Sequence, residues 1–414
     1  MLSHRQGCDK TLTYMKTYDF DKHINRIGTD SLKWDAAIQS TGKSNVRPLW
    51  VADMDFETPP FIYKAIKKRL DYKVLGYTKP FAPYYDSITN WLKHRYDISL
   101  NANQVHFIAG IVPGLHHAIC ALTEKGDKIL IQTPVYHPFH HIIEINERTK
   151  VESLLNIVGG RFEMNFEDLE KKLPGCKMML LCNPHNPGGT IWKPEELARL
   201  AVMCKQNNVL VISDEIHADM THADHRHIPF CKISEEAENN SITFMSPSKT
   251  FNMPGIVTSY CFAHNRTIRN KFYRFLDMAD VTVGNAFAYD CLQACYTPEG
   301  EEWLDQMLAY VKNNINTVEH FLAENCPKIE PMKTEASFLV FLDNRKMPFK
   351  SEKELIDFYL NDAGLFLNEG SMFGHNGTMF MRINVALPHK ELLQALEQLK
   401  QAYNNLAKKT TSHF

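Results

Sequence analysis

Four apolar runs of this sequence each end in residues that could carry chemistry. The runs are ILIQTPVYHPF, which leads to Tyr136, MMLLCNPHNPGG, which leads to Asn183 and Asn186, VLVISDEIH, which leads to Asp214 and His217, and SITFMSPSKTF, which leads to Lys249. Ligands of open parallel sheets bind beyond the carboxyl ends of the strands, so we expect these side chains to meet at one edge of a sheet. An aromatic ring, an amide, a carboxylate and an amine would then face one ligand.

This combination of groups matches what pyridoxal phosphate requires. The aldehyde of that cofactor bonds to a lysine amine, here Lys249, and its ring nitrogen needs a carboxylate, here Asp214, to stay protonated and accept electrons. The amide of Asn186 can donate to the phenolate oxygen, and the ring of Tyr136 can stack on the pyridine. The sequence therefore predicts pyridoxal chemistry on an α-amino acid.

Two parts of the sequence could bind the phosphate of the cofactor. Ser246 and Ser248 supply hydroxyls next to the lysine. The stretch HFIAGIVPGLHHAI predicts a strand, a glycine and then a helix start, where the free N–H groups of Ile111 and Val112 and the positive end of the helix dipole suit an anion. We expect Lys249 to lie among hydroxyls because the serines hold the phosphate beside it.

The elements that must position these residues follow a recurring pattern. A short apolar run ends in a polar or glycine-rich loop, and a helical pattern follows, which is typical of a mostly parallel α/β sheet flanked by helices. The runs cover residues 105–109, 129–131, 178–181, 209–212, 242–245 and 260–263.

The pattern changes after about residue 300, and this change indicates a second domain. Residues 301–325 have apolar positions spaced for one long amphipathic helix, SFLVFLD and TMFMRINVAL are typical of strands, and KELLQALEQLKQAYNNLAKK is typical of a closing helix. With 414 residues, the chain exceeds the length of ~150 residues expected for one domain. We expect a large α/β domain over residues 49–298, a smaller α+β domain over 15–48 and 299–414, and a disordered extension over 1–14.

Composition excludes several classes of partner. Lys and Arg number 46 against 48 Asp and Glu, so no basic excess favours nucleic acid or an anionic membrane. No apolar run approaches the ~18 residues of a membrane span, and the N-terminus lacks the apolar stretch of a signal peptide. The ten cysteines are scattered without C-x-x-C pairs, as expected for reduced thiols in a cytoplasmic enzyme.

Taken together and in this order, the motifs resemble those of the fold-type I pyridoxal-phosphate enzymes, the aspartate aminotransferase superfamily. The more specific motifs SLKWD, VADMDF, VLGYT, GIVPG, PVYHPF, PHNPGG, SDEIH, PSKTFN, EGSMFG and MRINVA resemble the branch of cystathionine β-lyases and cysteine-S-conjugate β-lyases. The resemblance covers residues from about 30 to about 400. It implies a large domain with a mostly parallel seven-stranded sheet and a smaller α+β domain.

The resemblance also implies roles for individual residues. Lys249 would carry the cofactor, Asp214 would pair with its ring nitrogen, Asn186 would donate to its phenolate oxygen and Tyr136 would stack on its ring. Arg382 in MRINVA would bind the substrate carboxylate with two parallel contacts, helped by Asn186. Tyr77 in LGYT would reach the phosphate from a neighbouring subunit, which implies a homodimer with shared active sites.

The sequence departs from the superfamily pattern at two places. Many members carry a tyrosine three residues after the aspartate, where this chain has His217, and an arginine about eight residues after the lysine, where TFNMPGIVTSY has no basic residue. The phosphate site would therefore depend more on Ser246, Ser248, Tyr77 and the backbone of Ile111 and Val112. The role of His217 is left open.

Two motifs suggest other chemistry. Ser246 and Lys249 have the S-x-x-K spacing of penicillin-binding acylases, but the companion S-D-N and K-T-G elements are absent. The histidines at 217, 222, 225 and 227 are crowded, but neither their spacing nor any nearby cysteine fits a metal site, so we expect no metal.

The same residues could support two reactions. Loss of a thiol from Cβ of a cysteine S-conjugate such as cystathionine would give pyruvate and ammonia, whereas return of a proton to the cofactor would make the enzyme an aminotransferase. The branch resemblance favours the carbon-sulfur lyase. A third possibility is a family member with an added regulatory binding role.

Overall fold

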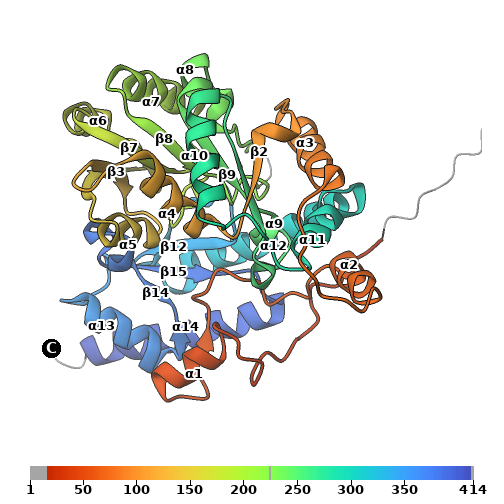
Figure 1. Ribbon diagram of the computed structural model, residues 1–414. Coiled ribbons are helices and arrows are strands. Elements are labelled where there is room, and N and C mark those ends of the chain that lie inside the picture. Colours follow the sequence, from red (N-terminus) through yellow and green to blue (C-terminus); the bar gives the residue numbers. More distant parts are fainter. Residues whose placement is uncertain (1–15, 223–224, 412–414) are drawn as a thin grey trace, which may run out of the picture.

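A seven-stranded sheet forms the centre of the molecule (Figure 1). The computed structural model describes residues 16–222 and 225–411, so the extension expected at residues 1–14 lies outside the described part. In sheet order the strands are β2 (Val105–Ile108), β10 (Ser259–Phe262), β9 (Ser241–Met245), β8 (Leu210–Asp214), β7 (Cys176–Cys182), β3 (Lys128–Thr133) and β4 (Thr149–Leu154). Neighbouring strands pair in parallel except at β10, which is antiparallel to β2 and β9. The predicted α/β fold with a mostly parallel seven-stranded sheet is confirmed.

Six of the seven strands coincide with the apolar runs of the sequence, but β4 does not. Its sequence, TKVESL, lies at the edge of the sheet, where Leu154 and Thr149 are exposed and only one of the six residues is buried. A strand at the edge of a sheet is less buried than a central strand and does not need a continuous apolar run. The apolar pattern that predicts the other six strands is therefore missing from β4.

Helices cover both faces of this sheet. Side chains that alternate along β7 enter different apolar clusters, Met178 and Leu180 on one face and Met179 and Leu181 on the other. The first cluster also contains residues of α4 (Ile111–Leu122), α5 (Pro138–Ile145) and α10 (Arg266–Met278). The second contains residues of α6 (Phe166–Lys172), α7 (Pro194–Gln206) and α8 (Glu235–Asn239). Burial on both faces explains why the central strands are apolar throughout.

A smaller antiparallel sheet follows in the C-terminal part. Its order is β11 (Glu330–Pro331), β12 (Leu339–Asp343), β15 (Phe380–Asn384) and β14 (Asn368–Glu369). The predicted strands SFLVFLD and TMFMRINVAL are confirmed as β12 and β15, and the closing helix is α14 (His389–Thr411).

The predicted long helix is α12 (Pro298–Asn325), and it begins three residues before its expected start. Thr297 caps it by accepting a hydrogen bond from the Gly300 amide at 3.1 Å, and Pro298 is the first helical residue. The cap, rather than the apolar spacing, sets where the helix begins.

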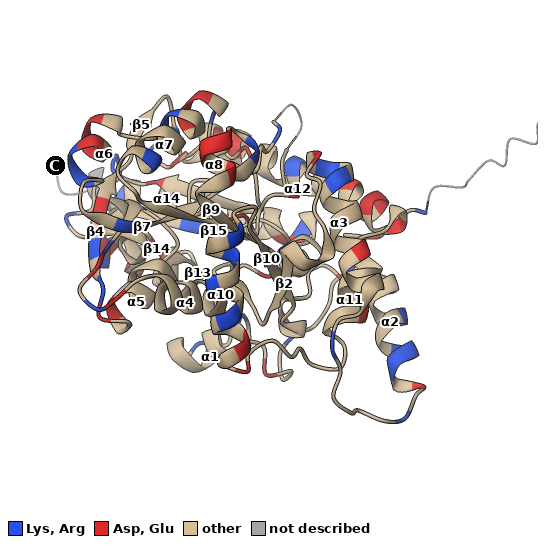
Figure 2. Cartoon of the chain, turned by 45° about the horizontal axis from the view of Figure 1, so that its top comes forward, with Lys and Arg blue, Asp and Glu red and all other residues tan. Residues whose placement is uncertain are grey.

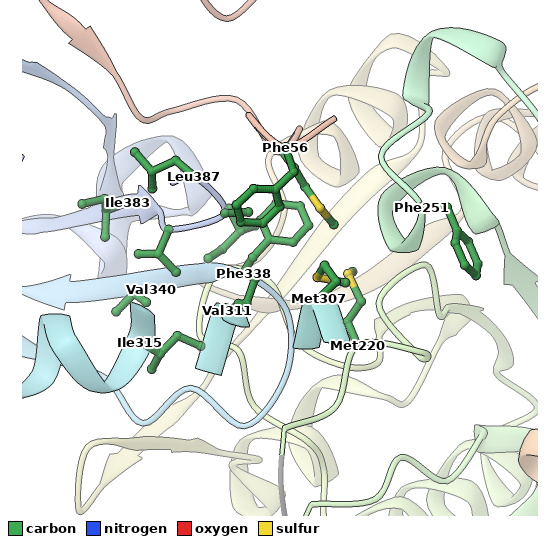
Figure 3. Packing of buried hydrophobic residues seen from close by; sticks show 14 of the residues in the cluster. Phe56, Met220, Phe251, Met307, Val311, Ile315, Phe338, Val340, Ile383 and Leu387 are labelled. Carbon is green, nitrogen blue, oxygen red and sulfur yellow. The ribbon is translucent and has the colours of Figure 1, made fainter. Parts of the chain in front are cut away.

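One apolar cluster joins α12 to the smaller sheet and to the N-terminal segment. Met307, Val311 and Ile315 of α12 belong to it together with Phe338 and Phe56 (Figure 3). Burying these side chains fixes the smaller sheet beside the large one. The domain boundaries at 48/49 and 298/299 stay a prediction.

The other elements connect these layers. They are α1 (Asp35–Thr41), β1 (Arg47–Pro48), α2 (Pro60–Leu70), α3 (Ala82–Tyr96), β5 (Asn156–Val158), β6 (Arg161–Glu163), α9 (Pro247–Thr250), α11 (Ala288–Cys295), α13 (Glu352–Asp357) and β13 (Leu365–Phe366). Acidic and basic side chains both occur on the outer helices (Figure 2). No helix within the described ranges is long and apolar enough to cross a bilayer.

Candidate active site

Lys249 lies just beyond the carboxyl end of β9. Ser246 follows the strand and caps the short helix α9, which carries the lysine. The Nζ atom of Lys249 donates a hydrogen bond to the carbonyl oxygen of Ala52 at 2.6 Å. Burial lowers the pKa of Lys249 to about 8, although Asp53 and Asp214 act in the opposite direction. Such an amine is neutral in roughly a tenth of the molecules at pH 7, far more often than an ordinary lysine, and a neutral amine can act as nucleophile or base.

The two serines are buried and bonded to each other. Ser246 Oγ lies 2.8 Å from Ser248 Oγ and 2.7 Å from the carbonyl oxygen of Thr258, and it accepts a hydrogen bond from the Ser248 amide at 3.1 Å. The Thr258 Oγ1 atom is buried without a hydrogen-bond partner. Hydroxyls at this place could donate to an acceptor-rich anion, and Thr258 adds to the two serines that the sequence predicts for the phosphate.

Glycines at the N-terminus of α4 allow its backbone to lie close to a bound anion. Gly110 precedes the helix with φ of 100°, a conformation that disfavours residues with a side chain. A Cβ atom on Gly114 would lie 2.7 Å from the Phe244 ring, so only glycine lets α4 pack this closely on β9. The first turn, with Ile111 and Val112, therefore begins next to the strand that leads to Lys249.

Asp214 ends β8 and is buried. Its Oδ1 accepts a hydrogen bond from the Ile216 amide at 3.1 Å, and its backbone pairs with Cys182 of β7. Burial raises the pKa of Asp214 to about 7, although the Ile216 contact and Lys249 act in the opposite direction. A buried carboxylate of this kind would gain much from a cation placed beside it.

Arg382 is buried in β15 among neutral acceptors. Its Nη1 donates to Asn186 Oδ1 at 2.9 Å, and its Nη2 donates to Asn368 Oδ1 at 2.7 Å and to the Trp50 carbonyl at 3.0 Å. Its guanidinium lies 4.8 Å from the centre of the Phe373 ring, and its Nε has no partner. Burial lowers the pKa of Arg382 to about 10. Its partners within the described chain are uncharged, so the positive charge is available to a ligand carboxylate.

A cavity of about 870 Å³ lies beside Lys249 and Arg382. Lys249, Arg382, Tyr136 and Asn368 line it. Asn186 reaches the same place through its bond to Arg382, which occupies the amide oxygen and leaves the Nδ2 group as the donor. Of the predicted aromatic ring, amide, carboxylate and amine, the cavity thus brings together the Tyr136 ring and the Lys249 amine, with the Asn186 amide reached through Arg382. The Asp214 carboxylate is not among the lining residues.

His217 and Tyr77 have different environments. His217 is buried, its Nδ1 has no partner, and burial lowers its pKa to about 3, so the ring is neutral. Tyr77 is fully exposed and does not line the cavity. His222 and His227 bond to the Ser337 carbonyl and to Glu215 respectively, and so point to separate partners.

A charged cluster at the cavity wall was not predicted from the sequence. Arg26 binds the Asp53 carboxylate with two bonds, at 2.6 and 3.0 Å, and Asp55 at 2.8 Å. The fully buried Lys33 donates to Asp55 at 2.6 Å. These bonds fix the segment whose Ala52 carbonyl accepts from Lys249. The motifs SLKWD and VADMDF contain the lysine and both aspartates, but nothing in them reveals that they pair.

The residues present fit pyridoxal phosphate. The buried Asp214 suits a protonated ring nitrogen, and the unpartnered Thr258 hydroxyl beside Ser246 and Ser248 suits a phosphate. Lys249 would bond to the aldehyde carbon, Asn186 would donate to the phenolate oxygen and Tyr136 would cover a ring face.

Comparisons with known proteins agree with this chemistry. The model of the family "Aminotransferase class I and II" matches residues 45–399. The chain is 38% identical to cystathionine β-lyase PatB of Bacillus subtilis over 386 residues, which cover 93% of this chain and 99% of PatB. It superposes on cystalysin of Treponema denticola, which contains pyridoxal 5'-phosphate, with a TM-score of 0.91 and 34% identity over 94% of this chain and 100% of that one. It also superposes on the pyridoxal-phosphate-bound C-S lyase of Staphylococcus hominis, with a TM-score of 0.88 and 33% identity over 94% of this chain and 98% of that one.

Proposed function

The chain belongs to the aminotransferase class I and II family, and from this premise we propose that it is a pyridoxal-phosphate-dependent carbon-sulfur β-lyase. It acts on cystathionine or related cysteine S-conjugates and releases a thiol, pyruvate and ammonia. The observation that carries the proposal is a single cavity lined by Lys249 and Arg382, in a chain that is 38% identical to a cystathionine β-lyase along nearly its whole length.

The residues divide the chemistry between them. Bound pyridoxal phosphate supplies an electron sink for the pair released at the substrate Cα. Lys249 would hold the cofactor through its aldehyde carbon, and the neutral Nζ of Lys249 would take the Cα proton of the substrate. Asp214 would keep the ring nitrogen of the cofactor protonated, and Arg382 would orient the substrate through its carboxylate. When the Cβ–S bond breaks, sulfur keeps the bonding pair.

Cystathionine supplied without any keto acid tests the proposal. We expect pyruvate and ammonia to accumulate in equal amounts, because a lyase needs no amino acceptor. An absolute requirement for a keto acid would identify an aminotransferase, which uses the same residues, and would overturn the proposal.

Arg382→Lys is expected to weaken substrate binding. A lysine keeps the charge but loses the paired geometry and the bonds to Asn186 and Asn368. Losing one hydrogen bond to a charged group costs about 1.5–3 kcal/mol, so KM should rise about 10- to 100-fold, with a smaller change in kcat. Steady-state kinetics with cystathionine measure this. An unchanged KM would remove Arg382 from the carboxylate site.

The uptake of cofactor should depend on pH in a way set by Lys249. Only the neutral amine attacks the aldehyde, so the uptake rate of the cofactor-free protein should rise with pH and level off near pH 8, the lowered pKa of Lys249. An ordinary lysine would continue to gain reactivity up to about pH 10.4. Stopped-flow absorbance between pH 7 and 10 distinguishes the two. A rate still rising tenfold per unit at pH 9.5 would contradict the lowered pKa.

We further propose that the protein is a homodimer that acts on a small-molecule substrate. The substrate is a small amino acid, and neither nucleic acid nor membrane takes part. A homodimer is supported by the exposed apolar side chains of Tyr72, Val74, Leu75 and Tyr77, which a second copy would cover, bringing Tyr77 to the partner's phosphate site. A monomeric mass in sedimentation equilibrium would contradict this. The nine free thiols among the described residues suit a cytoplasmic location.

A further inference from the structure

The cavity has a polar wall and an apolar wall. Lys249, Arg382 and Asn368 belong to the polar wall, where the amino acid part of a substrate is bound. The apolar wall comes from the N-terminal segment, from α2 and from the loop before β10. Its members are Ile24, Leu32, Ile62, Tyr63, Ile66, Pro254 and Ile256. The side chains of Leu32 and Tyr63 are 64% and 51% exposed, so they present apolar surface that a substrate could cover.

The charges near the apolar wall do not favour an anionic group. The cations among the described residues that line the cavity are Lys249, Arg382 and Arg26. The first two serve the cofactor and the substrate carboxylate. Arg26 is occupied by Asp53 and Asp55, which hold it through three bonds of 2.6 to 3.0 Å.

A second carboxylate would therefore have to compete for Arg26. The part of cystathionine that leaves with the sulfur carries both a carboxylate and an ammonium group. Asp53, Asp55 and Glu57 also line the cavity. Each of them is already paired with a cation, Arg26, Lys33 or Lys22. The described residues beside the apolar wall therefore offer no unpaired charge to the carboxylate or to the ammonium group, and burying both groups there without partners is unfavourable. An alkyl or aryl thiol carries no charge and would instead cover the apolar wall.

From this arrangement we infer that the apolar wall is the site of the leaving thiol and that it selects cysteine S-conjugates of uncharged alkyl or aryl thiols over cystathionine. The inference rests on the proposed lyase function. In the reaction, the Cα–H and Cβ–S bonds break, sulfur keeps its bonding pair and leaves as a thiol after protonation, and water hydrolyses the remainder to pyruvate and ammonia. Tyr63 and Ile66 of α2 are the specificity-determining residues.

S-benzyl-L-cysteine and L-cystathionine are the probes that test this selection. With the cofactor-loaded enzyme and no keto acid, kcat/KM for pyruvate release should be at least ~10-fold higher for S-benzyl-L-cysteine, a ratio that apolar pockets commonly reach. Calorimetry with the Lys249→Ala protein, which does not turn the compounds over, measures their dissociation constants and gives the same comparison for binding alone. Equal values, or a preference for cystathionine, would overturn the inference while the lyase function stands. Failure to cleave either compound would overturn the proposed function and the inference together.

A substitution on α2 tests the placement of the wall. Ile66→Lys puts a cation where a leaving carboxylate could reach it, so the preference for S-benzyl-L-cysteine should fall by at least ~10-fold. Val202→Lys makes an equivalent change at an exposed position of α7 and should leave the preference unchanged. The visible absorbance of the bound cofactor shows whether each variant is folded and loaded. If Ile66→Lys is loaded and keeps the original preference, the apolar wall is not the leaving-group site.

Discussion

Replacing Lys249 with alanine should lower kcat for pyruvate release from cystathionine by about 100- to 10,000-fold, the range that a positioned acid-base group contributes. The variant loses both the bond to the cofactor and the neutral amine, whose pKa of about 8 suits proton removal at Cα. Its yellow absorbance should be lost as well. Borohydride reduction of the wild type, followed by peptide mass mapping, should locate the cofactor on Lys249.

Two controls separate chemistry from folding. Lys249→Arg keeps a cation at this position but cannot bond to the aldehyde or act as a base, so it should be as inactive as the alanine variant. Lys125→Ala removes an exposed lysine and should be fully active. Adding a small primary amine to Lys249→Ala should restore part of the rate. Normal turnover by Lys249→Ala would show that another group performs the chemistry.

The sequence predicts the large sheet and the residues at the ends of its strands because both depend on local patterns. Strands buried on two faces must be apolar, so a charged residue at the end of such a strand or in the loop after it stands out, as Asp214 and Lys249 do. Because these strands are parallel, their carboxyl ends lie at the same edge of the sheet. The edge strand β4 lacks this pattern because little of it is buried.

The contacts between distant segments could not be predicted in the same way. Arg382 meets Asn368 because β14 and β15 pair in a register that places the two residues opposite each other. Arg26 meets Asp53 and Asp55 in a segment without regular structure of its own, where no periodicity indicates which charges pair. The role of Tyr77 stays a prediction because a contact across subunits leaves no trace in one chain.

Asp214→Asn is expected to lower kcat by about 100- to 1,000-fold, the range found when a preorganised electrostatic contact is removed from a buried site. The asparagine has nearly the same shape and can still accept the Ile216 amide hydrogen bond. It carries no charge, however, so it cannot hold a proton on the ring nitrogen. The visible spectrum of the loaded protein and nitrogen NMR of labelled cofactor should both report loss of that proton, independently of turnover.

Asp219→Asn is the matched control, because Asp219 is another fully buried aspartate with a raised pKa. Its carboxylate bonds to Trp91 Nε1 at 3.2 Å and to Tyr96 Oη at 2.6 Å. The cation that lowers its pKa most is Arg95, whereas Lys249 does so for Asp214. This variant should lower the melting temperature, because a buried network is weakened, and should leave the cofactor spectrum unchanged. Asp214→Asn should change the cofactor spectrum and leave the melting temperature of the cofactor-free protein nearly unchanged, since without cofactor the buried carboxylate has no hydrogen-bonded cation among the described residues. If Asp214→Asn keeps its activity within about threefold and its ring nitrogen stays protonated, another group must stabilise the charge on the ring.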